Sequence, residues 1–365
     1  MRVVERPEGL FWLISRYDDV RAALTDPRFS KDWRHASPEA RAGAPTFRLP
    51  TMLMMDPPDH TRLRKLVSRS FTLRRTAELR PRVEQIAAEL LDGVADDLVD
   101  LMTAYAVPLP VQVICELLGV PVEDRGEFTT WSNTLVDQIS PEETAADSAN
   151  LARYLGELVD RKRSEPDDAL LSALIEVADD GDRLSHEELV AMGVLLLVAG
   201  NETTINLIGN ALLGLLTHPD QLALLRERPE LTSSLVEEVL RWDGPVQNAT
   251  YRFPTTDVEV AGTTIPAGSV VRLSLAAANR DPSRFPDADE LRIDRDASGH
   301  LDFGHGLHHC LGAQLARMEG EVAIRTLLAR YPDLTLAVDP AELVYRPSMI
   351  VRGLTALPVR LGAPA

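Results

Sequence analysis

Apolar residues recur every three or four positions through most of this chain, and polar residues begin each run. This spacing is typical of helices with one buried face, and it predicts helices over residues 80–95, 149–164, 185–217, 219–226, 231–242 and 313–330. Strand patterns are short, at residues 10–15, 258–260, 269–275 and 354–361. The pattern therefore predicts a mainly α fold with small sheets. Residues 30–55, rich in Pro, Ala and Arg, and a break at residues 139–143 are predicted loops.

The predicted helix 185–217 is the most apolar of the set. Its first half is almost entirely aliphatic up to Gly200, and polar residues then interrupt it at Asn201, Glu202, Thr203, Asn206 and Asn210. The uninterrupted part is well short of the ~20 residues that a membrane span needs. We therefore expect the buried central helix of a large bundle. A carboxylate beside a hydroxyl is costly at such a place unless both groups have a function.

Composition limits the class of protein. The chain has 365 residues, 45% of them hydrophobic, with no repeat and no Gly/Ser linker. We therefore expect a single domain over residues 1–365. Its two cysteines, far apart in sequence, argue against a disulfide framework. The only apolar run near the N-terminus, residues 10–14, is too short for a signal peptide or a membrane anchor. We expect a soluble, cytoplasmic protein.

Charge adds one exclusion and one candidate surface. A net charge of −18 argues against nucleic acid as a partner. Residues 60–75, in contrast, contain no acidic residue and six basic ones, namely Arg62, Arg64, Lys65, Arg69, Arg74 and Arg75. Such a run is either a solvated helix face or a surface that steers an acidic partner.

The segment 303–312 presents Cys310 in a loop that Gly304 and Gly306 allow to turn tightly. A helix is predicted just after Cys310, and its N-terminus would favour a thiolate. A zinc site made with the nearby histidines lacks the two separated ligand pairs that such sites use. A dinucleotide loop lacks its third glycine. A buried structural cysteine would not require this glycine pattern.

This segment resembles the haem-binding loop of the cytochrome P450 family, through Phe303, Gly304, Gly306, His308, Cys310 and Gly312. The resemblance implies the cytochrome P450 fold and haem b with Cys310 as its thiolate ligand. Residues 199–204, Ala-Gly-Asn-Glu-Thr-Thr, resemble the oxygen-activation motif of the family. By that resemblance, Ala199 leaves room over the haem, Glu202 relays protons from solvent, and Thr203 donates a hydrogen bond during oxygen activation.

Two further motifs extend the resemblance. Glu238 and Arg241 resemble the family's Glu-x-x-Arg pair, whose usual third partner is an Arg or His of a later segment. Glu290 stands where that base is expected, and Arg292 is the candidate substitute. Cations also occupy the four positions at which the family binds the haem propionates, namely His60, Arg64, Arg252 and His308.

The implied activity is monooxygenation with dioxygen, and electrons would come from NAD(P)H through a ferredoxin reductase and a ferredoxin. The implied substrate is a bulky apolar molecule of the polyketide, macrolide or steroid-like kind, in a pocket lined by Leu195, Val198, Ala199, Val246, Met349 and Ile350. A haem-thiolate peroxygenase and a non-catalytic haem-binding protein are the alternatives. Family members usually have another helix before their first strand, so we expect an abbreviated start.

Overall fold

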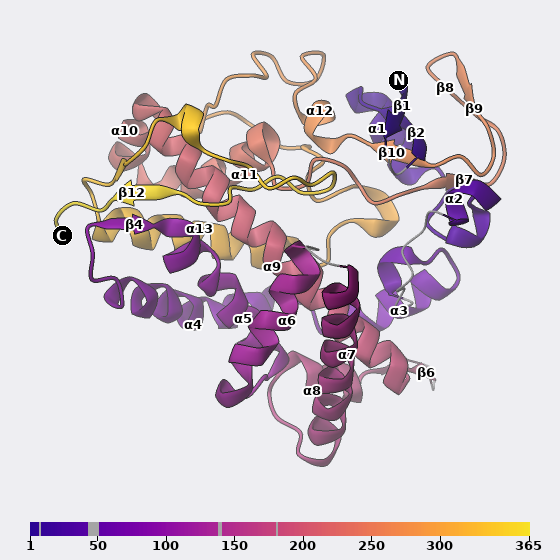
Figure 1. Cartoon of the computed structure of the whole chain (residues 1–365), viewed down its shortest axis with the longest axis horizontal. Helices are drawn as coiled ribbons and strands as arrows, with labels where there is room; N and C mark the ends of the chain where they lie inside the picture. Colours follow the sequence, from indigo (N-terminus) through magenta and orange to yellow (C-terminus); the bar gives the residue numbers. More distant parts are fainter. Residues whose placement is uncertain (7–8, 43–50, 138–140, 180–181) are drawn as a thin grey trace.

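The computed structural model describes residues 1–6, 9–42, 51–137, 141–179 and 182–365. Helices dominate it, with the small sheets set around them (Figure 1). The helices in chain order are α1 (Tyr17–Thr25), α2 (Pro38–Ala42), α3 (Asp59–Ser68), α4 (Leu73–Asp92), α5 (Pro108–Leu118), α6 (Arg125–Asp137), α7 (Pro141–Ser164), α8 (Leu170–Glu176), α9 (His186–Thr217), α10 (Pro219–Glu227), α11 (Thr232–Asp243), α12 (Leu275–Asn279) and α13 (Ala313–Arg330). The prediction of a mainly α fold is confirmed.

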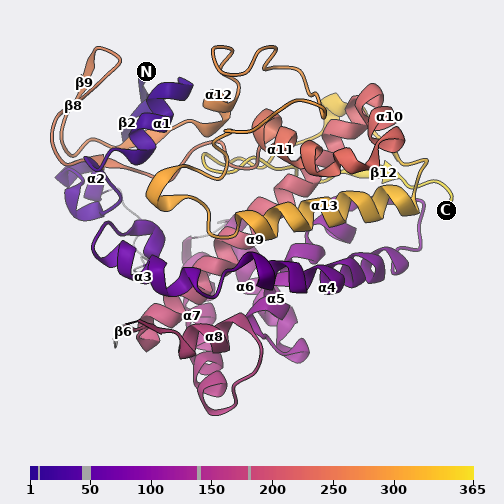
Figure 2. The same cartoon turned by 180° about the vertical axis from the view of Figure 1, so that it is seen from behind.

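Helix α9 is the central element, and it crosses the middle of the molecule in both views (Figures 1 and 2). It begins with a capping box, in which the Ser185 hydroxyl accepts from the Glu188 amide and the Glu188 carboxylate accepts from the Ser185 amide. By length and hydropathy α9 could cross a membrane, but 61% of its apolar window is buried inside the fold. The prediction of a buried central helix is confirmed.

The predicted helices agree with the structure best where the apolar period is longest. The helix predicted at 313–330 is α13, and that predicted at 185–217 is α9 to within one residue. Helix α4 begins earlier than predicted, at Leu73, because Thr72 caps its N-terminus by accepting from the Arg75 amide. Helix α7 also begins early, at Pro141, which shortens the predicted break; residues 138–140 lie outside the described residues.

The predicted loop 30–55 was only partly right. It contains helix α2 and two single turns of 3₁₀-helix, η1 (Trp33–His35) and η2 (Met52–Met54). Asp32 caps η1, because its carboxylate accepts from the Arg34 amide. Residues 43–50 of this segment lie outside the described residues.

The largest sheets have three strands each. Strand β2 (Gly9–Ile14) pairs antiparallel with β1 (Arg2–Arg6) and parallel with β10 (Val271–Leu273). Strand β12 (Pro358–Arg360) lies between β4 (Leu98–Asp100) and β11 (Thr335–Leu336). The two-stranded sheets are β3 (Phe29–Ser30) with β7 (Phe253–Pro254), β5 (Ala178–Asp179) with β6 (Asp182–Arg183), and β8 (Val258–Val260) with β9 (Thr263–Ile265).

Two predicted strands are shorter than expected. The strand predicted at 269–275 ends at Leu273, because the Ser274 side chain instead caps α12 by accepting from the Ala277 amide. The strand predicted at 354–361 is reduced to β12, and Leu354 forms only an isolated bridge with Tyr345. The strand predicted at 10–15 is confirmed as β2, although β1 before it was not predicted.

Candidate active site

Residues 303–312 form a closed loop immediately before α13. The Cys310 amide donates to the Phe303 carbonyl at 2.8 Å, which joins the two ends of the loop. Gly304 and Gly306 have φ values of +70° and +72°, which confirms the predicted need for glycine at both positions. The loop therefore holds the Cys310 side chain in place by backbone geometry.

Opposing groups act on the Cys310 thiol. Desolvation of the sulfur raises its pKa although the residue as a whole is exposed, while a hydrogen bond from the Gly312 amide and the positive charges of Arg64 and Arg317 act to lower it. Gly312 is also the N-cap of α13, so the predicted helix N-terminus does lie beside the sulfur. Coordination to a metal ion removes the proton of such a thiol outright.

Phe303 lies under a charged cluster that the sequence did not predict. The Arg317 guanidinium stacks 4.5 Å from the centre of the Phe303 ring and makes a forked ion pair with Glu237, at 2.5 and 3.0 Å. His300 approaches the same carboxylate at 3.2 Å. Burial raises the pKa of Glu237, but its hydrogen bonds with His300 and Arg317 outweigh burial and lower that pKa to about 2. The carboxylate therefore holds both the Arg317 and the His300 side chains against the loop.

The four predicted propionate-binding cations show the properties of an anion site. The His60 and His308 rings lie 4.2 Å apart, and Arg252 is 4% exposed. Burial lowers the pKa of all four side chains, to about 2 for His308 and about 10 for Arg252. The neighbouring positive charges lower the pKa of His308 further. The structure thus brings together four side chains from separate positions in the sequence, called the cation group below, in which Arg64 and Arg252 carry the positive charge because the pKa values of both histidines are lowered.

Two polar atoms in this group have no hydrogen-bond partner, His60 Nδ1 and Arg252 Nε. Buried polar atoms without partners are unfavourable, and so are buried charges without counter-ions. Both penalties are relieved by a ligand that carries carboxylates, which Arg recognises well. The residues present therefore fit a haem with two propionates.

Helix α9 is exposed on one face at the predicted oxygen-activation motif. Ala199 and Gly200 are exposed in the middle of this long helix, whereas Asn201 and Thr204 are buried. The Thr203 hydroxyl donates to the Ala199 carbonyl at 2.8 Å, on the open face. Glu202, next to it, is partly exposed. Small residues, a hydroxyl and a carboxylate therefore share a short accessible stretch of an otherwise buried helix.

The predicted substrate-lining residues fall into two groups. Val246 forms a β-bridge with Val351, and the neighbouring Gln247 amide donates to the Ile350 carbonyl at 2.8 Å. The Asn248 side chain donates to the Met349 carbonyl at 2.6 Å. These contacts bring Val246 together with Met349 and Ile350. Leu195 and Val198 form the second group with Ala199 on α9, and all six residues are partly exposed or exposed.

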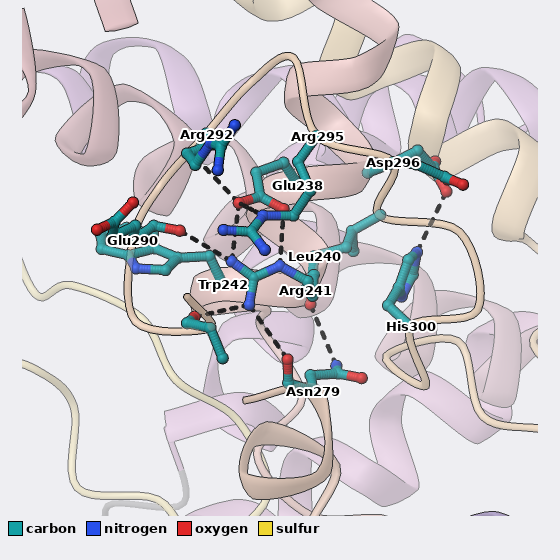
Figure 3. A network of polar contacts seen from close by, with 12 residues as sticks. Glu238, Leu240, Arg241, Trp242, Asn279, Glu290, Arg292, Arg295, Asp296 and His300 are labelled. Atoms are coloured by element: carbon teal, nitrogen blue, oxygen red, sulfur yellow. Dashed lines mark hydrogen bonds and ion pairs between the residues drawn. The ribbon is translucent and has the colours of Figure 1, made fainter. Parts of the chain in front are cut away.

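Glu238 and Arg241 form a completely buried ion pair on α11, and Figure 3 shows the contacts around it. Arg241 donates to both carboxylate oxygens of Glu238, at 2.7 and 2.8 Å. Its remaining donors reach the carbonyls of Asn279, Ala288 and Glu290. Removing one partner from such a pair costs on the order of 3–5 kcal/mol, because the other charge stays buried. The pair therefore fixes the segment after α12 to α11.

The third partner of this pair is Arg295, which the sequence did not predict. The Arg295 side chain lies 3.2 Å from Glu238 and is 10% exposed (Figure 3). The candidate Arg292 gives Glu238 only its backbone amide, at 3.0 Å, and its guanidinium faces Asp287 and Asp294 instead. Glu290, at the position expected for a base, contributes its carbonyl. The charge is thus supplied five residues later than the sequence pattern indicates.

A thiol held in a glycine loop before a helix, a buried group of cations that fits carboxylates, and an opened central helix define a haem-thiolate oxygenase. The chain belongs to the cytochrome P450 family, whose model matches residues 142–351. It is accordingly a cytochrome P450 monooxygenase with a haem-thiolate cofactor.

Two relatives and one solved structure illustrate the match. The chain is 60% identical to the vitamin D(3) 25-hydroxylase of Pseudonocardia autotrophica, over 99% of this chain and 91% of that protein. It is 51% identical to the cytochrome P450 monooxygenase PikC of Streptomyces venezuelae, over 98% of this chain and 87% of that protein. The structure of tirandamycin C-bound P450 monooxygenase TamI superimposes with a TM-score of 0.92 at 46% identity, over 99% of this chain and 94% of that one.

Proposed function

We propose that this protein hydroxylates or epoxidises a bulky, apolar molecule of the polyketide, macrolide or steroid-like kind. The observation that carries the proposal is the apolar character of the predicted lining, on α9 and beside the bridge between Val246 and Val351. No residue of this lining offers a cation to bind a substrate carboxylate. Two relatives support the substrate class, one named for vitamin D(3) and one solved with tirandamycin C.

In this proposal the residues of the chain hold the cofactor and move protons. Cys310 ligates the haem iron, while His60, Arg64, Arg252 and His308 bind the two propionates. Bound haem supplies the reductive activation of dioxygen, and a thiolate ligand favours cleavage of the O–O bond. Thr203 donates a hydrogen bond toward the site of oxygen chemistry, and Glu202 relays protons from solvent. Phe303 and Gly312 would help to bind the haem, and the small side chain of Ala199 would leave room over it.

The substrate class is tested by enlarging one lining residue. We expect Val246→Phe to weaken large ring systems more than small ligands, because overfilling a packed site costs about 1–3 kcal/mol. That corresponds to roughly five- to 150-fold in Kd. Kd values come from titrations of the haem spin-state change with macrolides, steroids and fatty acids.

Val344→Phe is the matched control, because Val344 is 60% exposed and outside the lining, and its Kd values should equal those of the wild type. If fatty acids bind most tightly and ring systems produce no spin-state change, the proposed substrate class is wrong. Peroxide-driven turnover without any electron donor would then favour the peroxygenase alternative. Absence of turnover with either system would favour a non-catalytic haem protein.

We further propose that the electrons come from a ferredoxin that docks on the basic segment. Phe71, Leu73 and Thr76 line a small surface pocket together with Leu311 and Gly312, so this segment adjoins the loop of Cys310. Leu73 is 71% exposed, and Lys65, Arg69 and Arg74 of the same segment are exposed cations. Arg62 is less exposed, and it donates to Asp182 and Glu188. An exposed apolar residue among cations suits a small acidic protein.

Reversing two charges tests this surface. We expect Arg69→Glu combined with Arg74→Glu to slow reduction by ferredoxin without changing the haem spectrum, since exposed cations steer an acidic partner. The wild-type rate should fall as ionic strength rises, because screening acts over about 10 Å at 0.1 M salt. Stopped-flow reduction measures both effects.

The matched control reverses Arg153 and Arg228 to Glu. Arg153 forms an exposed i,i+4 pair with Glu157, as Arg74 does with Glu78, and Arg228 is 53% exposed. This double variant changes the net charge equally but leaves the basic segment intact. If both double variants are reduced as fast as the wild type, ferredoxin docks elsewhere.

A further inference from the structure

Lys31 is a buried lysine next to the cation group of the site. It follows strand β3 and is 1% exposed, although lysine is almost never buried without a partner. Strand β3 pairs with β7, which follows directly on Arg252. The Lys31 ammonium donates to the hydroxyl of Thr250, two residues before Arg252. The fold therefore carries this lysine from a distant part of the sequence to the cation group.

The surroundings of Lys31 are positively charged. Burial lowers the pKa of Lys31, and the nearby charge of Arg252 lowers it further. Lys31 in turn adds to the effect of burial in lowering the pKa of His308. Asp56 is the acidic group that opposes this charge, but its oxygens accept from the Ser30 hydroxyl and, at 2.9 Å, from the Lys31 amide. Asp56 therefore anchors the backbone at Lys31 and leaves the ammonium to other partners.

The ammonium has further capacity for hydrogen bonds. An ammonium group has three N–H donors, and the Thr250 hydroxyl takes one of them. A buried cation is tolerated only when an anion and hydrogen bonds compensate it. His60 and Arg252, in the same group, each hold a buried nitrogen without a partner. The two carboxylates of one haem offer hydrogen-bond acceptors to the Lys31 ammonium and to these nitrogens of His60 and Arg252.

We infer that Lys31 is a fifth residue that binds a haem propionate, with Thr250 orienting its ammonium and Asp56 fixing its backbone. This inference needs only that the protein binds haem, and it is independent of the substrate and of the electron donor. It makes two physical predictions. Lys31 should slow the loss of haem, and its charge should stabilise the reduced haem, which carries one more negative charge than the oxidised form.

The test replaces Lys31 by methionine, which keeps the length of the side chain and removes the charge. We expect haem to pass from the ferric holoenzyme to excess apomyoglobin about ten- to a hundred-fold faster than from the wild type, the range that loss of one charged hydrogen bond gives. The reduction potential should become more negative. Lys31→Arg keeps a cation and should retain most of both properties.

Arg228→Met is the matched control, because Arg228 is 53% exposed, lies outside the cation group and the basic segment, and its replacement also removes one positive charge. It should leave the rate of haem release and the potential unchanged. A purely structural role for Lys31 predicts that Lys31→Met changes thermal stability while the reduction potential stays that of the wild type, and that result would overturn the inference. Unchanged haem release in Lys31→Met would also overturn it.

If Lys31→Met does not yield folded haem protein, Thr250→Val decides the question by the same two measurements. This change keeps the shape of the side chain and removes the hydroxyl that orients the ammonium. Faster haem release together with a more negative potential would support the inference. Wild-type values of both would reject it.

Discussion

Replacing Cys310 by serine is expected to abolish the strongly red-shifted Soret band of the reduced carbon monoxide complex. This band requires a thiolate ligand, and a serine hydroxyl does not ionise to replace it. Monooxygenase turnover should be lost as well, since the thiolate promotes O–O cleavage. A carbon monoxide difference spectrum of the dithionite-reduced protein measures the first effect.

Cys115→Ala is the matched control for this experiment. Cys115 is completely buried on α5, and burial raises the pKa of its thiol to about 12. The thiol is therefore neutral and cannot act as a thiolate ligand. The variant should keep the full red-shifted band. A Cys310→Ser protein that retains this band would refute the assignment of the haem ligand.

Replacing Thr203 by alanine is expected to separate oxygen consumption from product formation. Oxygen and reductant should still be consumed, but mainly to hydrogen peroxide or water, because a positioned proton donor is missing. Loss of such a donor costs about 10²–10⁴ in the chemical step. The ratio of product to NAD(P)H consumed, with peroxide assayed in parallel, measures the effect.

Thr204→Ala provides a close comparison. The Thr204 hydroxyl donates to the Gly200 carbonyl at 2.9 Å, as Thr203 does to Ala199 at 2.8 Å, but Thr204 is 2% exposed and faces the protein interior. Both changes remove the same bond to the preceding turn of α9. If the ratio of product to NAD(P)H consumed falls equally in the two variants, the cause is the lost hydrogen bond within α9 and not lost proton delivery.

The sequence predicted the long helices well because each buries one continuous apolar face. Helix α13 was predicted at both ends, since Gly312 precedes it and the apolar period stops at Arg330. Helix α1 and strand β1 were not predicted, because α1 lacks a start signal such as the proline that begins α10, and β1 shows no clear alternation. Such short elements depend on neighbours that are distant in the sequence.

The candidate site residues that fitted a spaced motif could be located from the sequence, and those that depend on packing could not. His60, Arg252 and His308 come from three distant segments, and the structure brings them together as expected. Arg295 lies outside the expected position for the third partner of Glu238, and only the path of the chain brings it within 3.2 Å. Lys31 carries no periodic signal at all. A buried lysine is visible only once its surroundings are known.

The buried pair of Glu238 and Arg241 has a consequence for the irregular chain between α12 and α13. Residues 280–312 contain a single 3₁₀ turn, η6 (Gly306–His308), and loops of this length are usually mobile. Here, however, the amides of Arg292, Ile293 and Leu301 donate to the side chains of Glu238, Gln221 and Asn279. Side-chain acceptors therefore satisfy these backbone amides, as the carbonyls of a neighbouring strand do within a sheet. The amide protons of these three residues should exchange with solvent as slowly as those of the surrounding helices.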